Sequence, residues 1–120
     1  LGFLPAEHMM ALYKNCQAVI MPSYFGSTNI PPLEAWFMGK PLIYSKLFSE
    51  QAGNAALLVD PDDTDSVAYA MKSVLDESIS KKYIKNGYER LKQITTMRKD
   101  CEKKIFEKLL HFEQKRKCWE

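Results

Sequence analysis

The loop that follows a short apolar run ending at Met21 contains residue types suited to binding a phosphate. Its residues are small and polar, and Pro31-Pro32 behind it can open a helix. Free backbone amides at a helix start, together with the positive end of the helix dipole, favour an anion. Since proline has no amide hydrogen, the amides that can reach a ligand are those of Ser27, Thr28, Asn29 and Ile30.

Glu34 is expected in the first turn of this helix, where its carboxylate can reach paired hydroxyls such as those of a ribose. Two simpler interpretations stay open. Glu34 can merely complement the helix dipole, and Thr28 or Asn29 can merely cap the helix. Because the loop has neither a GxGxxG nor a GxxxxGK[ST] pattern, its composition alone does not identify a phosphate site.

The other reactive residue types predict no metal centre and no nucleophile. His8 and His111 have no partner at metal-ligand spacing, and Ser23 has no evident base. Three cysteines are present, an odd number without CxxC spacing: Cys16, Cys101 and Cys118. This cysteine usage favours a reducing, cytoplasmic location over a disulfide framework.

Three short apolar runs predict strands that would position the loop. They cover residues 18–21, 41–44 and 55–59, and the first is expected to be buried on both faces. Helical patterns alternate with them, which indicates βαβ units and a parallel sheet. We therefore expect an α/β fold with a partial, Rossmann-like parallel sheet of about three strands and flanking helices. Ligands of such sheets bind outside the carboxyl ends of the strands, where the loop lies.

The helical pattern begins after Pro5, resumes at Pro31 and ends at Gly39. Residues 48–53 are expected to form one or two helical turns, and the acidic turn at residues 60–63 can cap the next helix. Its apolar stripe comprises Val67, Met71, Val74 and Leu75. Two further helices are expected in residues 81–120, one around residues 84–91 and one around 101–112.

Length and composition allow one modest globular domain. The 120 residues are 46% hydrophobic and 27% charged, which argues against disorder, and a net charge of +2 does not call for nucleic acid as a partner. No apolar run approaches the roughly 18 residues that a membrane span requires. Basic residues gather near the end of the chain at Lys103, Lys104, Lys108, Lys115, Arg116 and Lys117. They form either a solvated helix face or a surface for peripheral contact with an anionic membrane.

Six landmarks of the sequence, in order and at matching spacing over nearly the first 80 residues, resemble those of group 1 glycosyltransferases. They are Gly2-Phe3-Leu4-Pro5, Leu12-Tyr13, Met21-Pro22-Ser23, Pro31-Pro32-Leu33-Glu34-Ala35, Gly39-Lys40-Pro41 and the run from Ala52 to Pro61. The resemblance implies a GT-B fold, in which two Rossmann-like domains face a cleft and the C-terminal domain holds a nucleotide sugar. It also implies retention of anomeric configuration and no metal or other cofactor besides the nucleotide-sugar substrate.

The family pattern has two glutamates eight positions apart around a glycine-rich loop. The second falls on Glu34, whose implied role is to hold the ribose hydroxyls of the donor. The first falls on Gly26, so the carboxylate expected at the donor sugar is absent, and the Gly-Phe-Gly that follows it in the family becomes Ser27-Thr28-Asn29. The resemblance also places the nucleobase against the main chain of Leu4.

We therefore expect residues 1–120 to be a single partial domain, the C-terminal portion of a donor-binding domain. Its partners would be a nucleotide sugar, a glycan or lipid-linked acceptor, and the missing N-terminal part of the same enzyme. That part would carry the acceptor domain and the Arg and Lys that clamp the diphosphate, so the chain alone should be inactive. The unpaired sheet edge should favour self-association. The alternative is a non-catalytic, Rossmann-like binding or interaction module. Gly26, at the position where the family has its first acid, favours this alternative.

Overall fold

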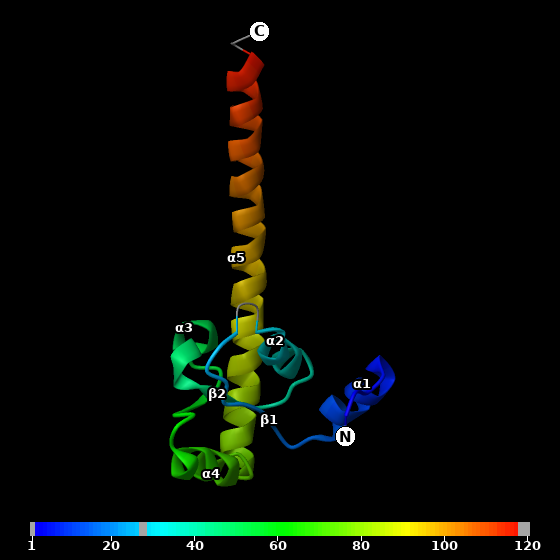
Figure 1. Cartoon of the computed structure of the whole chain (residues 1–120), viewed down its shortest axis with the longest axis vertical. Coiled ribbons are helices and arrows are strands. Elements are labelled where there is room, and N and C mark those ends of the chain that lie inside the picture. Colours follow the sequence, from blue (N-terminus) through cyan, green and yellow to red (C-terminus); the bar gives the residue numbers. More distant parts are fainter. Residues whose placement is uncertain (1, 27–28, 118–120) are drawn as a thin grey trace.

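A three-stranded parallel sheet forms the centre of the protein, whose computed structural model describes residues 2–26 and 29–117 (Figure 1). The strands are β1 (Val19–Met21), β2 (Leu42–Ser45) and β3 (Leu57–Val59), in the order β1-β2-β3. Ile20 lies opposite Ile43 in the first pair, and Tyr44 lies opposite Leu58 in the second. The expected sheet of three parallel strands is confirmed.

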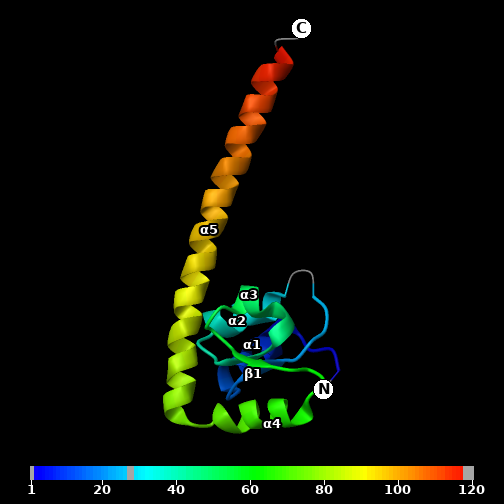
Figure 2. The same cartoon turned by 90° about the vertical axis from the view of Figure 1, so that its left-hand side faces the viewer.

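Helices cover both faces of this sheet because the residues of β2 alternate between two hydrophobic clusters. Leu42 and Tyr44 pack with residues of α2 (Ile30–Phe37) and α3 (Ser49–Ala52). Ile43 packs on the opposite face with Val59 and with α4 (Thr64–Ser73). Figure 2 shows α2 and α3 on one side of the sheet and α4 on the other. The alternation of side chains along a strand thus gives a three-layer α/β/α arrangement.

The strands that flank β2 are only partly covered. Every residue of β2 is buried, whereas Ile20 of β1 and Leu58 of β3 are each 41% exposed. The expectation that the first strand is buried on both faces is therefore wrong. Within the described part of the chain β1 pairs with β2 alone, and self-association through its other edge stays a prediction.

Local sequence signals set the ends of several helices. Pro5 precedes α1 (Ala6–Asn15), and Gly39, at φ 65°, follows α2. The Asp63 side chain accepts hydrogen bonds from the amides of Asp65 and Ser66 at 2.9 and 3.2 Å, so the predicted cap of α4 is confirmed. The helical turns expected in residues 48–53 are present as η1 (Lys46–Phe48) and α3.

Several apolar residues of the helices are exposed to solvent. Phe37 of α2 is 73% exposed. Met71 and Leu75, which belong to the apolar stripe predicted for the helix after residues 60–63, are also exposed. In α1 no residue is buried, because this helix lies beside α2 with a pocket between them. Cys101 is also exposed.

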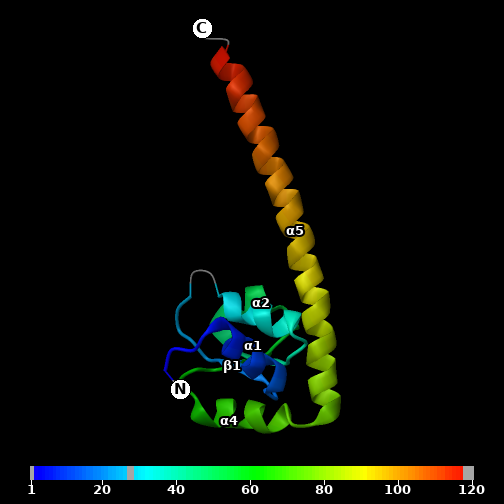
Figure 3. The same cartoon turned by 90° about the vertical axis from the view of Figure 1, so that its right-hand side faces the viewer.

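The last part of the chain is one helix, α5 (Glu77–Lys117), and the prediction of two helices there is wrong. Neither Gly nor Pro occurs between Leu91 and Cys101 to end the first segment, and Gly87 is tolerated inside the helix. The protein is 65 Å in its longest dimension, since α5 runs along one side of the body and continues beyond it (Figures 2 and 3). Residues 95–116 are all exposed. None of the described helices has the combination of length and apolar character that spanning a membrane requires.

The contact between α2 and α5 depends on Trp36, which is 1% exposed. Its indole Nε1 donates to the carbonyl of Ala55 at 3.0 Å, and its ring lies against Gly87. A methyl group at position 87 would come within 2.6 Å of the indole Cδ1. The absence of a side chain at Gly87 therefore lets α5 approach the helix that follows the candidate loop.

We expect Gly87→Ala to destabilise the protein, although alanine normally stabilises a helix interior by about 1 kcal/mol over glycine. Overpacking a buried contact costs about 1–3 kcal/mol, and the enclosed Trp36 ring cannot move aside freely. Chemical denaturation should show a lower free energy of unfolding for Gly87→Ala. The exposed Lys85→Ala on the same helix should be close to neutral. A Gly87→Ala protein more stable than the unaltered one would contradict this packing.

Candidate functional site

The candidate loop lies where the sequence predicts it, between the carboxyl end of β1 and the start of α2 (Figure 1). Gly26 is half-buried, Asn29 is buried and Ile30, the first residue of α2, is exposed. Ser27 and Thr28 lie outside the described residues. The helix therefore begins one residue before the predicted proline pair, with the positive end of its dipole toward the loop.

Asn29 occupies the N-cap position of α2, but its side chain makes no capping hydrogen bond. Its Nδ2 instead donates to Oε1 of Gln51 at 3.3 Å, and its carbonyl oxygen accepts from Nε2 of Gln51 at 3.1 Å. The interpretation of Asn29 as a simple helix cap is therefore wrong. Gln51, which the sequence analysis did not single out, ties the loop to α3 from 22 positions away along the chain.

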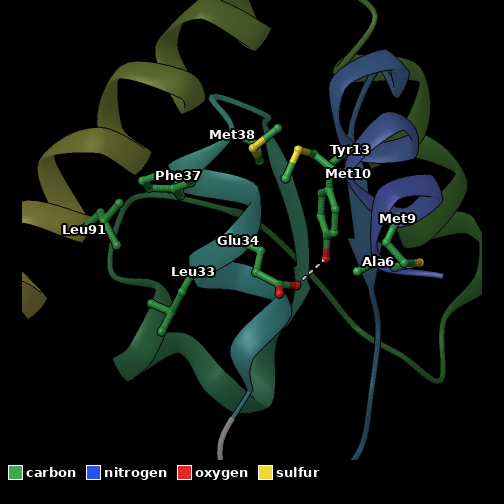
Figure 4. A pocket seen from close by; sticks show the side chains of 9 residues that line it. All are labelled: Ala6, Met9, Met10, Tyr13, Leu33, Glu34, Phe37, Met38 and Leu91. Carbon is green, nitrogen blue, oxygen red and sulfur yellow. Dashed lines mark hydrogen bonds between the residues drawn. The ribbon is translucent and has the colours of Figure 1, made fainter.

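Glu34 is an exposed residue in the second turn of α2, not in the first turn as expected. The effect of a helix dipole is concentrated in the first turn, so the dipole explains this position less well. The carboxylate oxygen Oε2 of Glu34 accepts a hydrogen bond from the Tyr13 hydroxyl at 2.8 Å (Figure 4). This bond links α1 with α2 and fixes the direction of the carboxylate.

The Tyr13 phenol remains a hydrogen-bond donor over the whole physiological range. Burial raises its pKa most, and the hydrogen bond to Glu34 and the negative charge of Glu34 raise it further, to about 12. Each of these effects disfavours the phenolate. In the sequence Tyr13 is notable only as part of the Leu12-Tyr13 landmark, and nothing relates it to a carboxylate 21 positions later.

A pocket of about 640 Å³ opens beside this pair, between α1, α2 and α5 (Figure 4). Its walls are almost entirely apolar, and among the residues that the structure describes Glu34 is the one charged residue that lines it. The lining residues are Ala6, Met9, Met10, Tyr13, Leu33, Glu34, Phe37, Met38 and Leu91. Apolar walls with one fixed polar group are typical of small-molecule sites. Leu4, predicted near a nucleobase, is half-buried just before α1 and is not among these residues.

Charged and phenolic side chains also meet at the carboxyl ends of the three strands. Lys46, directly after β2, forms an ion pair with Asp60, directly after β3. The hydrogen bond from Lys46 lowers the pKa of Asp60, and the same bond raises the pKa of Lys46. The Tyr24 hydroxyl, after β1, donates to Asp62 at 2.7 Å, which raises the pKa of Tyr24. These aspartates belong to the acidic turn predicted at residues 60–63, and the sheet topology brings the four groups together.

The described residues contain no group of three or more His, Cys, Asp or Glu side chains placed to hold a metal ion. Cys16 and Cys101 are free thiols, and both histidines are exposed. Within residues 2–26 and 29–117, the Ser23 hydroxyl is buried without a hydrogen-bond partner at the start of the loop. A buried polar atom of this kind is uncommon in a folded protein and fits a polar ligand site.

The Tyr13–Glu34 hydrogen bond predicts a late-ionising phenol. In an alkaline titration followed by phenolate absorbance, one tyrosine should ionise near the pKa of about 12 and disappear in Tyr13→Phe. Glu34→Gln removes the negative charge, so that phenol should ionise at lower pH. Tyr69→Phe, which removes an exposed phenol on α4, should leave the late ionisation of Tyr13 unchanged. The same late ionisation in Glu34→Gln as in the unaltered protein would contradict the contact.

Comparison with known proteins gives concordant results. The family described as "Glycosyl transferases group 1" matches residues 1–77. O-antigen chain mannosyltransferase B of Escherichia coli is 32% identical over 98 residues, which cover 79% of this chain and 26% of that protein. O-antigen chain mannosyltransferase RfbU of Salmonella typhimurium is 35% identical over 79 residues, covering 62% of this chain and 22% of that protein.

The structural comparison agrees with the sequence matches. Sucrose-phosphate synthase from Thermosynechococcus elongatus superimposes with a TM-score of 0.66 at 25% identity, covering 88% of this chain and 29% of that chain. The chain thus spans about a quarter of the length of each of these three proteins. The α/β fold with a Rossmann-like parallel sheet is confirmed. With a family match over more than half of its residues, the chain belongs to the group 1 glycosyltransferases.

Proposed function

We propose that this chain forms part of the donor-binding domain of a glycosyltransferase that moves a sugar from a nucleotide-sugar donor to a glycan or lipid-linked acceptor. Family membership and two relatives named as O-antigen mannosyltransferases support this activity and its place in polysaccharide biosynthesis. The family resemblance further supports retention of anomeric configuration and a reaction in which the nucleotide sugar is a substrate and no separate cofactor takes part.

The observation that carries the proposal is the position of Glu34, fixed by Tyr13 in the wall of the apolar pocket. Tyr13 contacts one carboxylate oxygen, and a carboxylate offers about four acceptor positions in all. Acceptor capacity therefore remains for the two hydroxyls of a ribose. Apolar side chains of α1 and α2 beside the carboxylate give a nucleoside a surface to pack against.

The loop before α2 would act on the diphosphate. Negative charge develops on the departing diphosphate during sugar transfer, and amides at a helix start stabilise such charge without reorganisation. Asn29 and Ile30 lie at this helix start, and the predicted amides of Ser27 and Thr28 precede them. The resemblance assigns the remaining positive charge to an Arg and a Lys in a segment that these 120 residues do not include.

We also propose a cytoplasmic location with peripheral contact of α5 at an anionic membrane surface. The free thiols of Cys16 and Cys101 support a reducing compartment. In the exposed half of α5, apolar residues such as Phe106, Leu109 and Phe112 alternate with several lysines. This combination of exposed apolar and basic side chains favours the surface of a membrane that carries lipid-linked acceptors.

A non-catalytic binding module is the second candidate, and one observation favours it. The position at which the family has its first acid is Gly26, which has no side chain to contact a donor sugar. The two candidates differ in what the intact protein does with a nucleotide sugar. Release of nucleoside diphosphate that depends on an acceptor supports the enzyme, whereas binding without release supports the module.

Glu34→Gln in the intact protein separates a binding role from a structural one. Loss of a charge-assisted hydrogen bond, worth about 1.5–3 kcal/mol, should weaken the binding of a nucleoside diphosphate by about tenfold or more. Calorimetric titrations with GDP, UDP and ADP measure this change. Glu50→Gln, an exposed acid in α3, should leave affinity unchanged.

A thermal melt of the same Glu34→Gln protein tests the opposing interpretation, in which Glu34 has only a structural role. If Glu34 only complements the dipole of α2, the variant should lose about 0.3–1 kcal/mol of stability. Its nucleotide affinity should then equal that of the unaltered protein. Intact binding with a shifted melt would refute the assignment of Glu34 to the donor site.

The 120-residue chain by itself should not transfer sugar. The family resemblance assigns the acceptor domain and the basic clamp to other parts of the enzyme, and this chain covers 26% of its mannosyltransferase relative. Incubation of the purified chain with GDP-mannose or UDP-glucose should release no nucleoside diphosphate above the rate without protein. The intact protein with its acceptor serves as the positive control, and turnover by the chain alone would overturn this expectation.

A further inference from the structure

The side chain of Asn29 occupies the space that a side chain at position 26 would need. A Cβ atom built on Gly26 would lie 1.7 Å from Oδ1 and 2.7 Å from Cγ of Asn29. No real Cβ atom tolerates such a contact with a neighbour that cannot move. Glycine at position 26 and asparagine at position 29 are therefore two parts of one arrangement.

Asn29 is held in this place rather than turned toward solvent. It is 7% exposed and has a φ of 20°, a positive value that asparagine and glycine tolerate better than other residues. Gln51 contacts it twice, through the Asn29 side chain and through the Asn29 carbonyl oxygen. Two contacts from one amide fix both the backbone and the side chain of Asn29.

Gln51 is in turn oriented by the core of the protein. The hydroxyl of the buried Tyr44 donates to Oε1 of Gln51 at 2.9 Å, and the Tyr44 ring stacks on Phe48 with centroids 5.2 Å apart. Burial raises the pKa of Tyr44, and this effect is larger than that of a hydrogen bond from Asn29, which lowers the pKa. The phenol therefore stays protonated. A protonated phenol makes Oε1 the acceptor and leaves Nε2 of Gln51 to donate to Asn29.

We propose that Asn29, positioned by Gln51 and Tyr44, supplies at the donor loop the polar group that Gly26 lacks and contacts the sugar of the nucleotide-sugar donor. The inference rests on the proposed function, since it assumes that the loop before α2 binds a donor. A neutral amide both donates and accepts hydrogen bonds, whereas a carboxylate only accepts them. The donor sugar would therefore meet an uncharged side chain, and Glu34 would contribute the carboxylate for the ribose.

Asn29→Gly tests the contact without straining the backbone, because glycine accepts the positive φ at this position. In the intact protein its affinity for GDP-mannose or UDP-glucose, whichever the unaltered protein binds, should fall about threefold to tenfold. Affinity for the corresponding GDP or UDP should change less than twofold. Gln51→Leu should show the same selective loss, and Gln17→Leu, at an exposed position, should show none.

A reciprocal exchange tests the shared space. Gly26→Glu alone should lose nucleotide-sugar affinity, because its Cβ would overlap Asn29. Combined with Asn29→Gly, the same glutamate gains room, and affinity for the nucleotide sugar should return to within about threefold of the unaltered protein. A thermal melt of each variant shows whether it is folded. If Gly26→Glu does not fold, the single variants Asn29→Gly and Gln51→Leu still test the inference.

Equal losses for nucleoside diphosphate and nucleotide sugar in Asn29→Gly would make Asn29 a scaffold residue and overturn the inference. Unchanged affinity for both would overturn it as well. In either case a loss of nucleoside diphosphate affinity in Glu34→Gln would leave the proposed function standing. An unaltered protein that binds neither GDP, UDP nor their sugar derivatives would refute the proposed function, and the inference with it.

Discussion

The burial of the Trp36 indole is the constraint on which the rest of this structure depends. The ring packs against Gly87 of α5, its Nε1 donates to the carbonyl of Ala55, and its neighbours belong to the main hydrophobic cluster. Three elements are thereby fixed relative to one another: α2, the segment leading into β3, and α5. Glu34 and Asn29 lie near the start of the same helix, so the indole that fixes α2 also fixes the positions of both polar groups.

The neighbourhood of Asn29 bears on a change from the family pattern that the resemblance implies at position 26. Glycine stands there in place of the implied acid, and the Asn29 side chain, three positions later, fills the space that a side chain at position 26 would need. The change also leaves one carboxylate fewer beside a site proposed for a diphosphate, where like charge is unfavourable. Tyr44 and Gln51, which support Asn29, lie in the sheet and in α3 and therefore depend on core packing more than on the loop.

The sequence predicted the elements better than it predicted the contacts between them. Apolar runs, prolines and the Asp63 cap indicated three parallel strands and most helices, because these signals act over a few residues. The loop and Glu34 were also identified, in part through the family resemblance. Tyr13, Lys46 and Gln51 were not, since Glu34, Asp60 and Asn29, which they contact at the site, lie 14 to 22 positions away and only the fold brings them together. The break predicted within α5 was wrong because a change in apolar pattern does not end a helix when no residue interrupts its backbone.

The length of α5 makes its local stability uneven. The turns around Gly87 and Leu91 pack against α2 and its cluster, whereas residues 95–116 are exposed and rely on helix propensity and on pairs such as Arg98–Glu102 and Lys103–Glu107. Such pairs each contribute about 0.2–0.5 kcal/mol, so the free energy of local opening falls along the helix toward its far end. Any surface that covers Ile105 or Leu109 adds its binding free energy directly to helix formation there. Helix formation beyond the body of the protein and binding to a partner are therefore thermodynamically coupled.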